Sequence, residues 1–188
     1  MRTIIGIDPG SRLCGWAVIQ QAGSVIKHVD NGVIVLDEKA PLHRRLASLH
    51  LAIQALIEKH APTNAAIESV FQHRNPHSAL VLGHARGVAL TCFALANISV
   101  QTFAPTEIKK LVAGHGRASK EQIQIMVARH LGLSDIPQSD AADAAAVALC
   151  HGLEVRLGNG IVLKSMQKRK RSKKQSDALL MQLAKRGK

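Results

Sequence analysis

The sequence predicts an α/β protein: a five-stranded mixed sheet, with three antiparallel plus two parallel strands, flanked by helices. Three runs rich in β-branched residues open the chain, and short strands then alternate with long stretches of helical periodicity. Hydrophobic residues make up 46% of the 188 residues but aromatic residues only 2%, so we expect a core of Ile, Leu, Val and Ala. A chain of this length can bury such a core within one domain.

The first three predicted strands form the antiparallel part of the sheet. Residues 3–8 predict a buried strand, and residues 15–21 and 25–36 predict two more. The turn at residues 22–24 is so short that the strands it joins must be antiparallel neighbours. Asp8-Pro9-Gly10 ends the first strand. Its carboxylate is either a metal ligand delivered to the edge of the sheet or a turn residue of the ordinary kind.

The following segments predict the parallel part of the sheet. Residues 41–60 have the apolar spacing of an amphipathic helix with Pro41 in its first turn. Residues 64–70 predict a fourth strand. Because a helix separates this strand from the first sheet strands, we expect a parallel crossover. Residues 99–104 predict the fifth strand.

Residues 76–96 predict a helix that is apolar almost all round and rich in small residues. A helix of this kind is buried by more than one neighbour, and a second copy of the chain is one candidate neighbour. Three more helices are predicted at residues 105–113, 119–130 and 140–155.

The charge is concentrated near the C-terminus. The net charge is +12, and residues 154–188 carry 11 Lys or Arg against 2 acids, which leaves only +3 for the rest. We therefore divide the chain into a folded domain at residues 1–157 and a basic, flexible tail at residues 158–188. Such a balance favours a polyanionic partner, either nucleic acid or an anionic membrane surface. The tail itself either solubilises the protein or adds DNA binding.

The cysteines and the apolar runs indicate a cytoplasmic protein. Cys14, Cys92 and Cys150 are widely spaced in apolar surroundings, so we expect buried, reduced thiols. Asp8 interrupts the N-terminal apolar run, so no signal peptide is predicted. No window approaches the roughly 18 uninterrupted apolar residues of a membrane span, and no membrane partner is expected.

Four acids are candidates for one site. Asp8 and Glu68 lie at predicted strand ends, and Glu68 has apolar neighbours. Asp140 and Asp143 share one face near the start of a helix, among alanines that would let the helix pack closely on a sheet. Each acid alone has an ordinary explanation, as a surface residue, an N-cap or a partner of the helix dipole. Together they occupy element ends that an α/β fold can bring into contact.

The chemistry of such a cluster points to divalent metal ions. Three or four neighbouring carboxylates resist ionisation unless cations neutralise them. Hard oxygen ligands select Mg²⁺ or Mn²⁺. Two such ions about 3.5–4 Å apart serve in-line attack at a phosphodiester. In a basic protein, the cluster therefore predicts a metal-dependent nuclease or a related phosphoryl-transfer enzyme.

Three sequence blocks carry the four acids. They are Ile5-Gly6-Ile7-Asp8-Pro9-Gly10-Ser11, Ala66-Ile67-Glu68-Ser69-Val70-Phe71 and Asp140-Ala141-Ala142-Asp143-Ala144, with Ala79-Leu80 and Gly83-His84-Ala85-Arg86-Gly87-Val88-Ala89 between them. In this order and at these intervals, they resemble the RuvC family of bacterial Holliday junction resolvases over residues 2–153. The resemblance implies a ribonuclease H-like fold and a homodimer that nicks two opposed strands of four-way junction DNA symmetrically. It also implies a place in homologous recombination and DNA repair, with RuvA and RuvB as partners.

The resemblance further assigns roles to residues. Those that match the family's metal-binding catalytic acids are Asp8, Glu68, Asp140 and Asp143. They imply two Mg²⁺ ions per site, for which Mn²⁺ can substitute. Phe71 matches an aromatic residue that meets a base near the crossover, and Lys109 and Lys120 match lysines close to the scissile DNA. Arg74 and Arg117 are additional candidates for DNA contact.

Other functions remain open at this point. Gly6-Ile7-Asp8-Pro9-Gly10 also suits the phosphate-contacting turn of an actin-like or sugar-kinase ATPase, but those folds need a second copy of the motif, which this sequence lacks. A non-catalytic basic nucleic-acid-binding protein would explain the charge but leaves Glu68 without a partner. Another ribonuclease H-like nuclease, acting on RNA or RNA–DNA hybrids, is the alternative enzyme because the acids alone do not specify the substrate.

Overall fold

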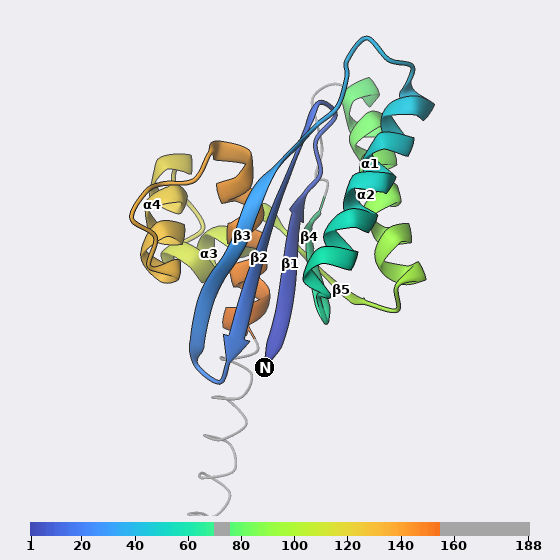
Figure 1. Cartoon of the computed structure of the whole chain (residues 1–188). Coiled ribbons are helices and arrows are strands. Elements are labelled where there is room, and N and C mark those ends of the chain that lie inside the picture. The colour runs from blue at the N-terminus through green and yellow to red at the C-terminus, as the bar shows by residue number, and fades with distance from the viewer. Residues whose placement is uncertain (70–75, 155–188) are drawn as a thin grey trace, which may run out of the picture. The chain divides into compact units, whose positions relative to one another are not determined.

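A five-stranded sheet organises the residues that the computed structural model describes, which are 1–69 and 76–154. Its strands are β1 (Arg2–Asp8), β2 (Leu13–Ala22), β3 (Val25–Val35), β4 (Asn64–Glu68) and β5 (Ser99–Phe103). They are ordered β3-β2-β1-β4-β5 (Figure 1). The pairs β1–β2 and β2–β3 are antiparallel, whereas β1–β4 and β4–β5 are parallel. The predicted mixed sheet is confirmed.

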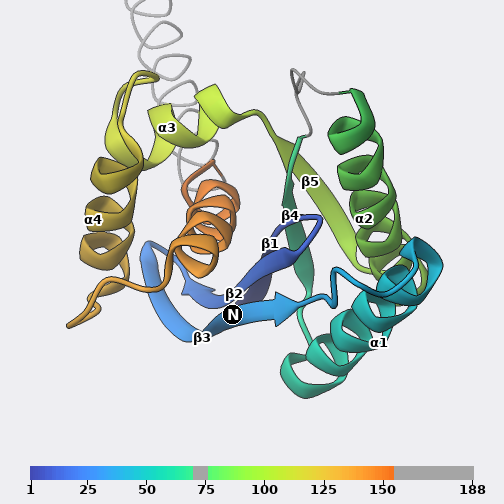
Figure 2. The ribbon, with the colours of Figure 1, turned by 90° about the horizontal axis from the view of Figure 1, so that it is seen from above.

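Helices cover both faces of this sheet (Figure 2). Four of them are α1 (Leu42–His60), α2 (Pro76–Leu95), α3 (Pro105–Ala113) and α4 (Lys120–Leu131). A further helix, drawn in orange, runs from residue 139 to residue 154, the last of the described residues. One face of the sheet packs against α1 and α2, and the other packs against α3, α4 and the 139–154 helix.

Most predicted element bounds differ from the structure by one or two residues, and two of the differences lie at the start of α1 and the end of β4. Pro41 is the N-cap of α1 with an extended ψ of 147°, and so it lies before the first turn. Its carbonyl accepts the first helical hydrogen bonds, as an N-cap carbonyl does. The strand predicted at residues 64–70 ends earlier, at Glu68, although the N–H of Ser69 still donates to the carbonyl of Phe103 at 2.9 Å.

Side chains alternate across the strands, which divides the core into two layers. On β1, Ile4 faces the 139–154 helix with α3 and α4, whereas Ile5 and Ile7 face α1 and α2. All three are fully buried. This period of two is the ordinary geometry of a strand. Both layers consist mainly of Ile, Leu, Val and Ala, as predicted.

The 139–154 helix lies close against the sheet because glycines face it. A Cβ on Gly6 would collide with the carbonyl oxygen of Ala144, and a Cβ on Gly15 would collide with that of Asp140. A glycine within a strand often marks such a close approach of another backbone. The side chains that the helix buries against the sheet are small as well, and they include Ala144 and Ala148. The expected close packing of an alanine-rich helix is confirmed.

Helix α2 is covered on one side within the chain. It packs against α1 and β5. Its buried residues are Ala85, Ala89, Cys92 and Phe93. Leu80 and Leu95 are 60% and 72% exposed, so much of its apolar surface faces outward. The described residues therefore bury α2 only in part, between α1 and β5.

By length and composition alone, α2 could also cross a membrane, although polar residues interrupt its apolar run. Arg86 is one of them, and it donates a hydrogen bond to Oγ1 of Thr102 in β5 at 3.0 Å. Because its buried residues belong to the core beneath the sheet, we interpret α2 as a helix of the folded domain.

The three cysteines are buried and form no disulfide with one another, as predicted. The predicted charge run and short helix of the 158–188 tail lie outside the described residues, as does the predicted domain boundary at residue 157.

Candidate active site

Asp8 and Glu68 lie side by side at one edge of the sheet. Each is the last residue of its strand, β1 and β4 respectively. These strands are parallel neighbours, with Ile7 opposite Ile67. Parallel neighbours end at the same edge of a sheet, so both strands deliver their carboxylates to one place.

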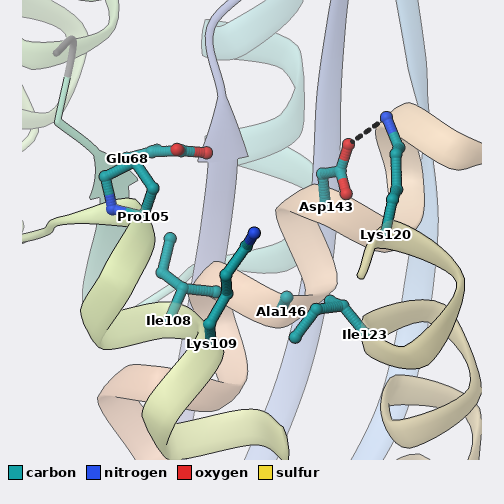
Figure 3. Close-up of a pocket in the computed structure, with 8 residues that line it drawn as sticks. All are labelled: Glu68, Pro105, Ile108, Lys109, Lys120, Ile123, Asp143 and Ala146. Atoms are coloured by element: carbon teal, nitrogen blue, oxygen red, sulfur yellow. Dashed lines mark ion pairs between the residues drawn. The ribbon is translucent and has the colours of Figure 1, made fainter. Parts of the chain in front are cut away.

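The 139–154 helix brings two more acids to this edge. Asp8 pairs with Gly15 across β1 and β2. The carbonyl of Asp140 lies where a Cβ of Gly15 would be, so the first turn of the helix stands over the Asp8–Gly15 pair. One turn further on, Asp143 lines the same cavity as Glu68 (Figure 3).

The pKa values of Asp8 and Glu68 show the influence of burial and of the neighbouring acids. Burial, followed by repulsion from Glu68, Asp143 and Asp140, raises the pKa of Asp8 to about 7. Burial and the charge of Asp143 also raise the pKa of Glu68. Like charges in a poorly hydrated place disfavour ionisation, so this cluster is stabilised by any cation that enters it.

A cavity of about 260 Å³ opens beside the acids (Figure 3). It is lined by Glu68, Pro105, Ile108, Lys109, Lys120, Ile123, Asp143 and Ala146. Helices α3 and α4 therefore supply one lysine each, together with an apolar floor. A cavity that combines carboxylates with ammonium groups suits a ligand that carries both metal ions and phosphate.

Lys120 makes a direct contact with the acids. Its Nζ lies 2.8 Å from Oδ2 of Asp143, drawn as the dashed line in Figure 3. This hydrogen bond raises the pKa of Lys120, so its ammonium form is favoured. Lys120 is the first residue of α4, where a capping box formed by Ser119 and Gln122 fixes the backbone.

The other predicted DNA-contacting residues have different outcomes. Lys109 lines the cavity together with Glu68 and Asp143, and its contact with DNA stays a prediction. Arg117 is exposed in the loop between α3 and α4, outside the set of cavity-lining residues. Phe71 and Arg74 lie outside the described residues.

Some residues that shape the site were not predicted from the sequence. Gly6 and Gly15 let the 139–154 helix approach the sheet and so set the height of Asp140 and Asp143. Glycines inside predicted strands were an available signal. The apolar floor formed by Ile108 and Ile123 carried no such signal, because apolar residues on amphipathic helices are ordinarily core residues.

The donor set fits a hard divalent cation. Carboxylate oxygens are the ligands that Mg²⁺ and Mn²⁺ prefer. The pKa values of Asp8 and Glu68 are raised by burial first and by neighbouring negative charge second. As the side chains stand, no three His, Cys, Asp or Glu residues within the described ranges are grouped closely enough to hold one ion together. The four carboxylates would have to move closer together to share an ion, and Oδ2 of Asp143 already contacts Lys120.

The mixed sheet and the acids at its edge define a ribonuclease H-like nuclease. A family model described as "Crossover junction endodeoxyribonuclease RuvC" matches residues 4–151. The chain belongs to the RuvC family. The enzyme of that name from Syntrophotalea carbinolica is 45% identical over 148 residues, which cover 79% of this chain and 92% of the relative. The Acinetobacter baylyi enzyme is 44% identical over 151 residues, with coverages of 80% and 83%.

Solved structures agree with this assignment. Thermus thermophilus RuvC in complex with a Holliday junction substrate superposes with a TM-score of 0.79 at 30% identity, covering 84% of this chain and 97% of that one. The yeast mitochondrial Holliday junction resolvase Ydc2 has a TM-score of 0.60 at 14% identity, covering 83% and 82%, and so shares the fold. The predicted fold and family are confirmed, and the actin-like and non-catalytic alternatives are not supported.

Proposed function

We propose that this protein is a structure-selective endonuclease that resolves four-way DNA junctions by paired, symmetric nicks in two opposed strands. The observation that carries the proposal is the meeting of four acids from β1, β4 and the 139–154 helix beside a cavity flanked by two lysines. This arrangement occurs in a chain of the RuvC family, and a solved member of that family is complexed with a Holliday junction substrate.

The metal-binding and catalytic residues in this proposal are Asp8, Glu68, Asp140 and Asp143. They would hold two Mg²⁺ ions, with Mn²⁺ as a substitute, and such ions supply an activated water and stabilisation of the leaving oxygen. The carboxylates of the chain have to be ionised to act as ligands. The raised pKa of Asp8 means that a proton competes for this position near neutral pH.

The remaining predicted residues would hold the DNA. Lys109 and Lys120, which line the cavity, would contact phosphates next to the scissile bond, where their positive charge offsets the charge of the backbone. Phe71 would stack on a base near the crossover. Arg74 and Arg117 would add contacts further out.

Paired nicking needs two active sites, so we propose a homodimer. The exposed apolar surface of α2 is the surface that supports this part of the proposal. The assembly would act in the bacterial cytoplasm with RuvA and RuvB in recombination and repair. Residues 1–157 would form the nuclease domain, and the basic tail at 158–188 would add electrostatic attraction to DNA.

The proposal is tested by cleavage of a synthetic four-way junction with Mg²⁺ by the wild type and by D8N and E68Q. Both substitutions keep the shape of the side chain but remove its negative charge. We expect junction binding by the variants but no cleavage, with D135N in an exposed loop as a matched control that cuts normally. Normal cleavage by D8N would remove Asp8 from the site. Cleavage confined to RNA–DNA hybrids by the wild type would favour the alternative nuclease.

A further inference from the structure

The ammonium group of Lys120 is held among the acids that we propose as metal ligands. Its Nζ lies 2.8 Å from Oδ2 of Asp143. Its positive charge also opposes the rise in the pKa of Asp8 and of Glu68. Lys109 lines the same cavity, but within residues 1–69 and 76–154 it forms no ion pair with any of the four acids.

The contact between Lys120 and Asp143 is suited to exchange. The backbone of Lys120 is fixed at the start of α4. Its side chain is 53% exposed, and the ammonium group lies at the end of a flexible four-carbon stem. The side chain of Asp143 is 24% exposed. Ion pairs this accessible to water are weak, because water and salt screen the attraction. The ammonium group can therefore leave Asp143 without a change in the position of α4.

A divalent ion and the ammonium of Lys120 would compete for Asp143. The metal ion has twice the charge, and at a short distance it repels the ammonium group. Without metal, four acids face two lysines and the cluster keeps an excess of negative charge. With two divalent ions, the cluster and its lysines become net positive, which favours movement of a lysine towards an incoming phosphate.

We propose that Lys120 is an exchangeable counter-ion, which neutralises Asp143 in the metal-free protein and passes to a DNA phosphate when metal takes its place. This inference rests on the proposed function, because it takes Asp143 as a metal ligand. Its consequence is a reciprocal coupling. DNA that attracts Lys120 frees Asp143 for metal, and metal on Asp143 frees Lys120 for DNA.

The alternative is that Lys120 only ties α4 to the 139–154 helix. A tether of this kind would help to position Asp143, so its loss would weaken metal binding. A competing counter-ion has the opposite effect, because its loss leaves Asp143 available. The direction of the change in metal affinity therefore separates the two roles.

The experiment titrates Mn²⁺ into the full-length, DNA-free protein and follows free Mn²⁺ by electron paramagnetic resonance. The proteins compared are the wild type, K120Q and the matched control K109Q, which removes the same charge from the same cavity. We expect K120Q to bind Mn²⁺ about two- to fivefold more tightly than the wild type, the range typical of a half-exposed ion pair. K109Q should change the affinity less.

A second measurement does not require K120Q to fold. In wild-type protein, the side-chain ammonium signal of Lys120 is observed by NMR and assigned by its loss in K120R. Saturation with Mg²⁺ in the absence of DNA should move this signal to the position of a solvent-exposed lysine, while the signal of Lys109 shifts less.

Three results would overturn the exchange: an affinity of K120Q at or below that of the wild type, equal tightening in K109Q, or a Lys120 signal that Mg²⁺ leaves in place. The failures of the two proposals are distinguishable. If none of the three proteins binds Mn²⁺, the proposed metal site is rejected and the exchange with it. If all bind and K120Q binds no more tightly, the exchange alone is rejected.

Discussion

Gly6 of β1 and Ala144 of the 139–154 helix meet backbone to backbone, and the carbonyl oxygen of Ala144 occupies the space that a Cβ on Gly6 would need. Asp143 precedes Ala144, and Asp8 lies two residues after Gly6. The distance between acids on the helix and on the strand therefore depends on the absence of a side chain at Gly6.

The first prediction concerns this close approach. G6A should lower the free energy of unfolding by about 1–3 kcal/mol, because an added methyl group in a packed core displaces its neighbours. Junction cleavage should fall as well, because the helix that carries Asp140 and Asp143 has to move. Thermal unfolding and single-turnover cleavage measure the two effects.

The matched control for this prediction is G83A in α2, where an added Cβ meets nothing within 4 Å. Alanine favours a helix over glycine by about 0.5–1 kcal/mol, so this variant should be as stable as the wild type or more stable. A G6A protein with wild-type unfolding temperature and cleavage would show that the close approach has no consequence.

The second prediction concerns pH and Asp8. Folding raises the pKa of Asp8 to about 7, so the folded protein holds this proton more tightly than the unfolded chain. Protonated Asp8 therefore favours folding at low pH, and this contribution to the free energy of unfolding is lost as the pH rises from about 4 through about 7. D8N, which cannot ionise, should therefore be more stable than the wild type at pH 8 in EDTA.

The upper limit of this gain is about 4 kcal/mol, because the pKa of Asp8 rises from 3.8 to about 7 and each tenfold change in proton affinity corresponds to 1.36 kcal/mol. Urea unfolding at pH 8 and pH 5 measures it, and the gain should shrink at pH 5, where wild-type Asp8 is already protonated in the folded state. A D8N protein less stable than the wild type at pH 8 would contradict the raised pKa of Asp8, which burial and the neighbouring acids cause.

The third prediction concerns α2 and the proposed dimer. Residues of α1 and α2 line a shallow cavity of about 430 Å³, and an added Cβ on Gly87 meets nothing within 4 Å in the single chain. Because Gly87 is exposed, G87E would place a charge on this face. We expect it to sediment as a monomer and to lose paired nicking, whereas G87A should remain a dimer. An unchanged dimer in G87E would exclude this face as the interface.

The fourth prediction concerns the basic tail. Truncation after Leu157 removes residues 158–188, with ten Lys or Arg and one acid. If the tail binds DNA, the truncated protein should bind the junction more weakly. The slope of log K against log salt concentration should also become less steep, by about 0.9 for each phosphate that the tail neutralises. Binding measured at several salt concentrations tests this, and an unaltered slope would show that the tail does not touch DNA.

Much of the fold was predictable because local patterns report it. The apolar run of β1 follows from burial of both its faces, and the helical spacing in α1 follows from burial of one face. Both elements were predicted. The convergence of Asp8 and Glu68 was also predictable, since parallel strands end at the same edge. For these features, the local sequence carries the information.

The rest of the site depends on contacts between segments far apart in the chain. The ion pair of Lys120 with Asp143 requires the relative position of two helices and a particular side-chain rotamer, neither of which periodicity reports. The uncovered part of α2 could not be located for a related reason, because composition alone cannot tell an apolar face covered within the chain from one left for another neighbour. The predicted roles of Phe71 and Arg74 stay predictions.

In the proposed dimer, one site per protomer cuts a four-way junction, and the two cuts are paired. This is tested by incubating the protein with Mg²⁺ and a synthetic immobile junction labelled in turn on each of its four strands, and by mapping the nicks. We predict nicks at symmetric positions in two opposed strands, with ends that a ligase can reseal. Nicks at unrelated positions, or in one strand alone, would contradict paired resolution by this protein.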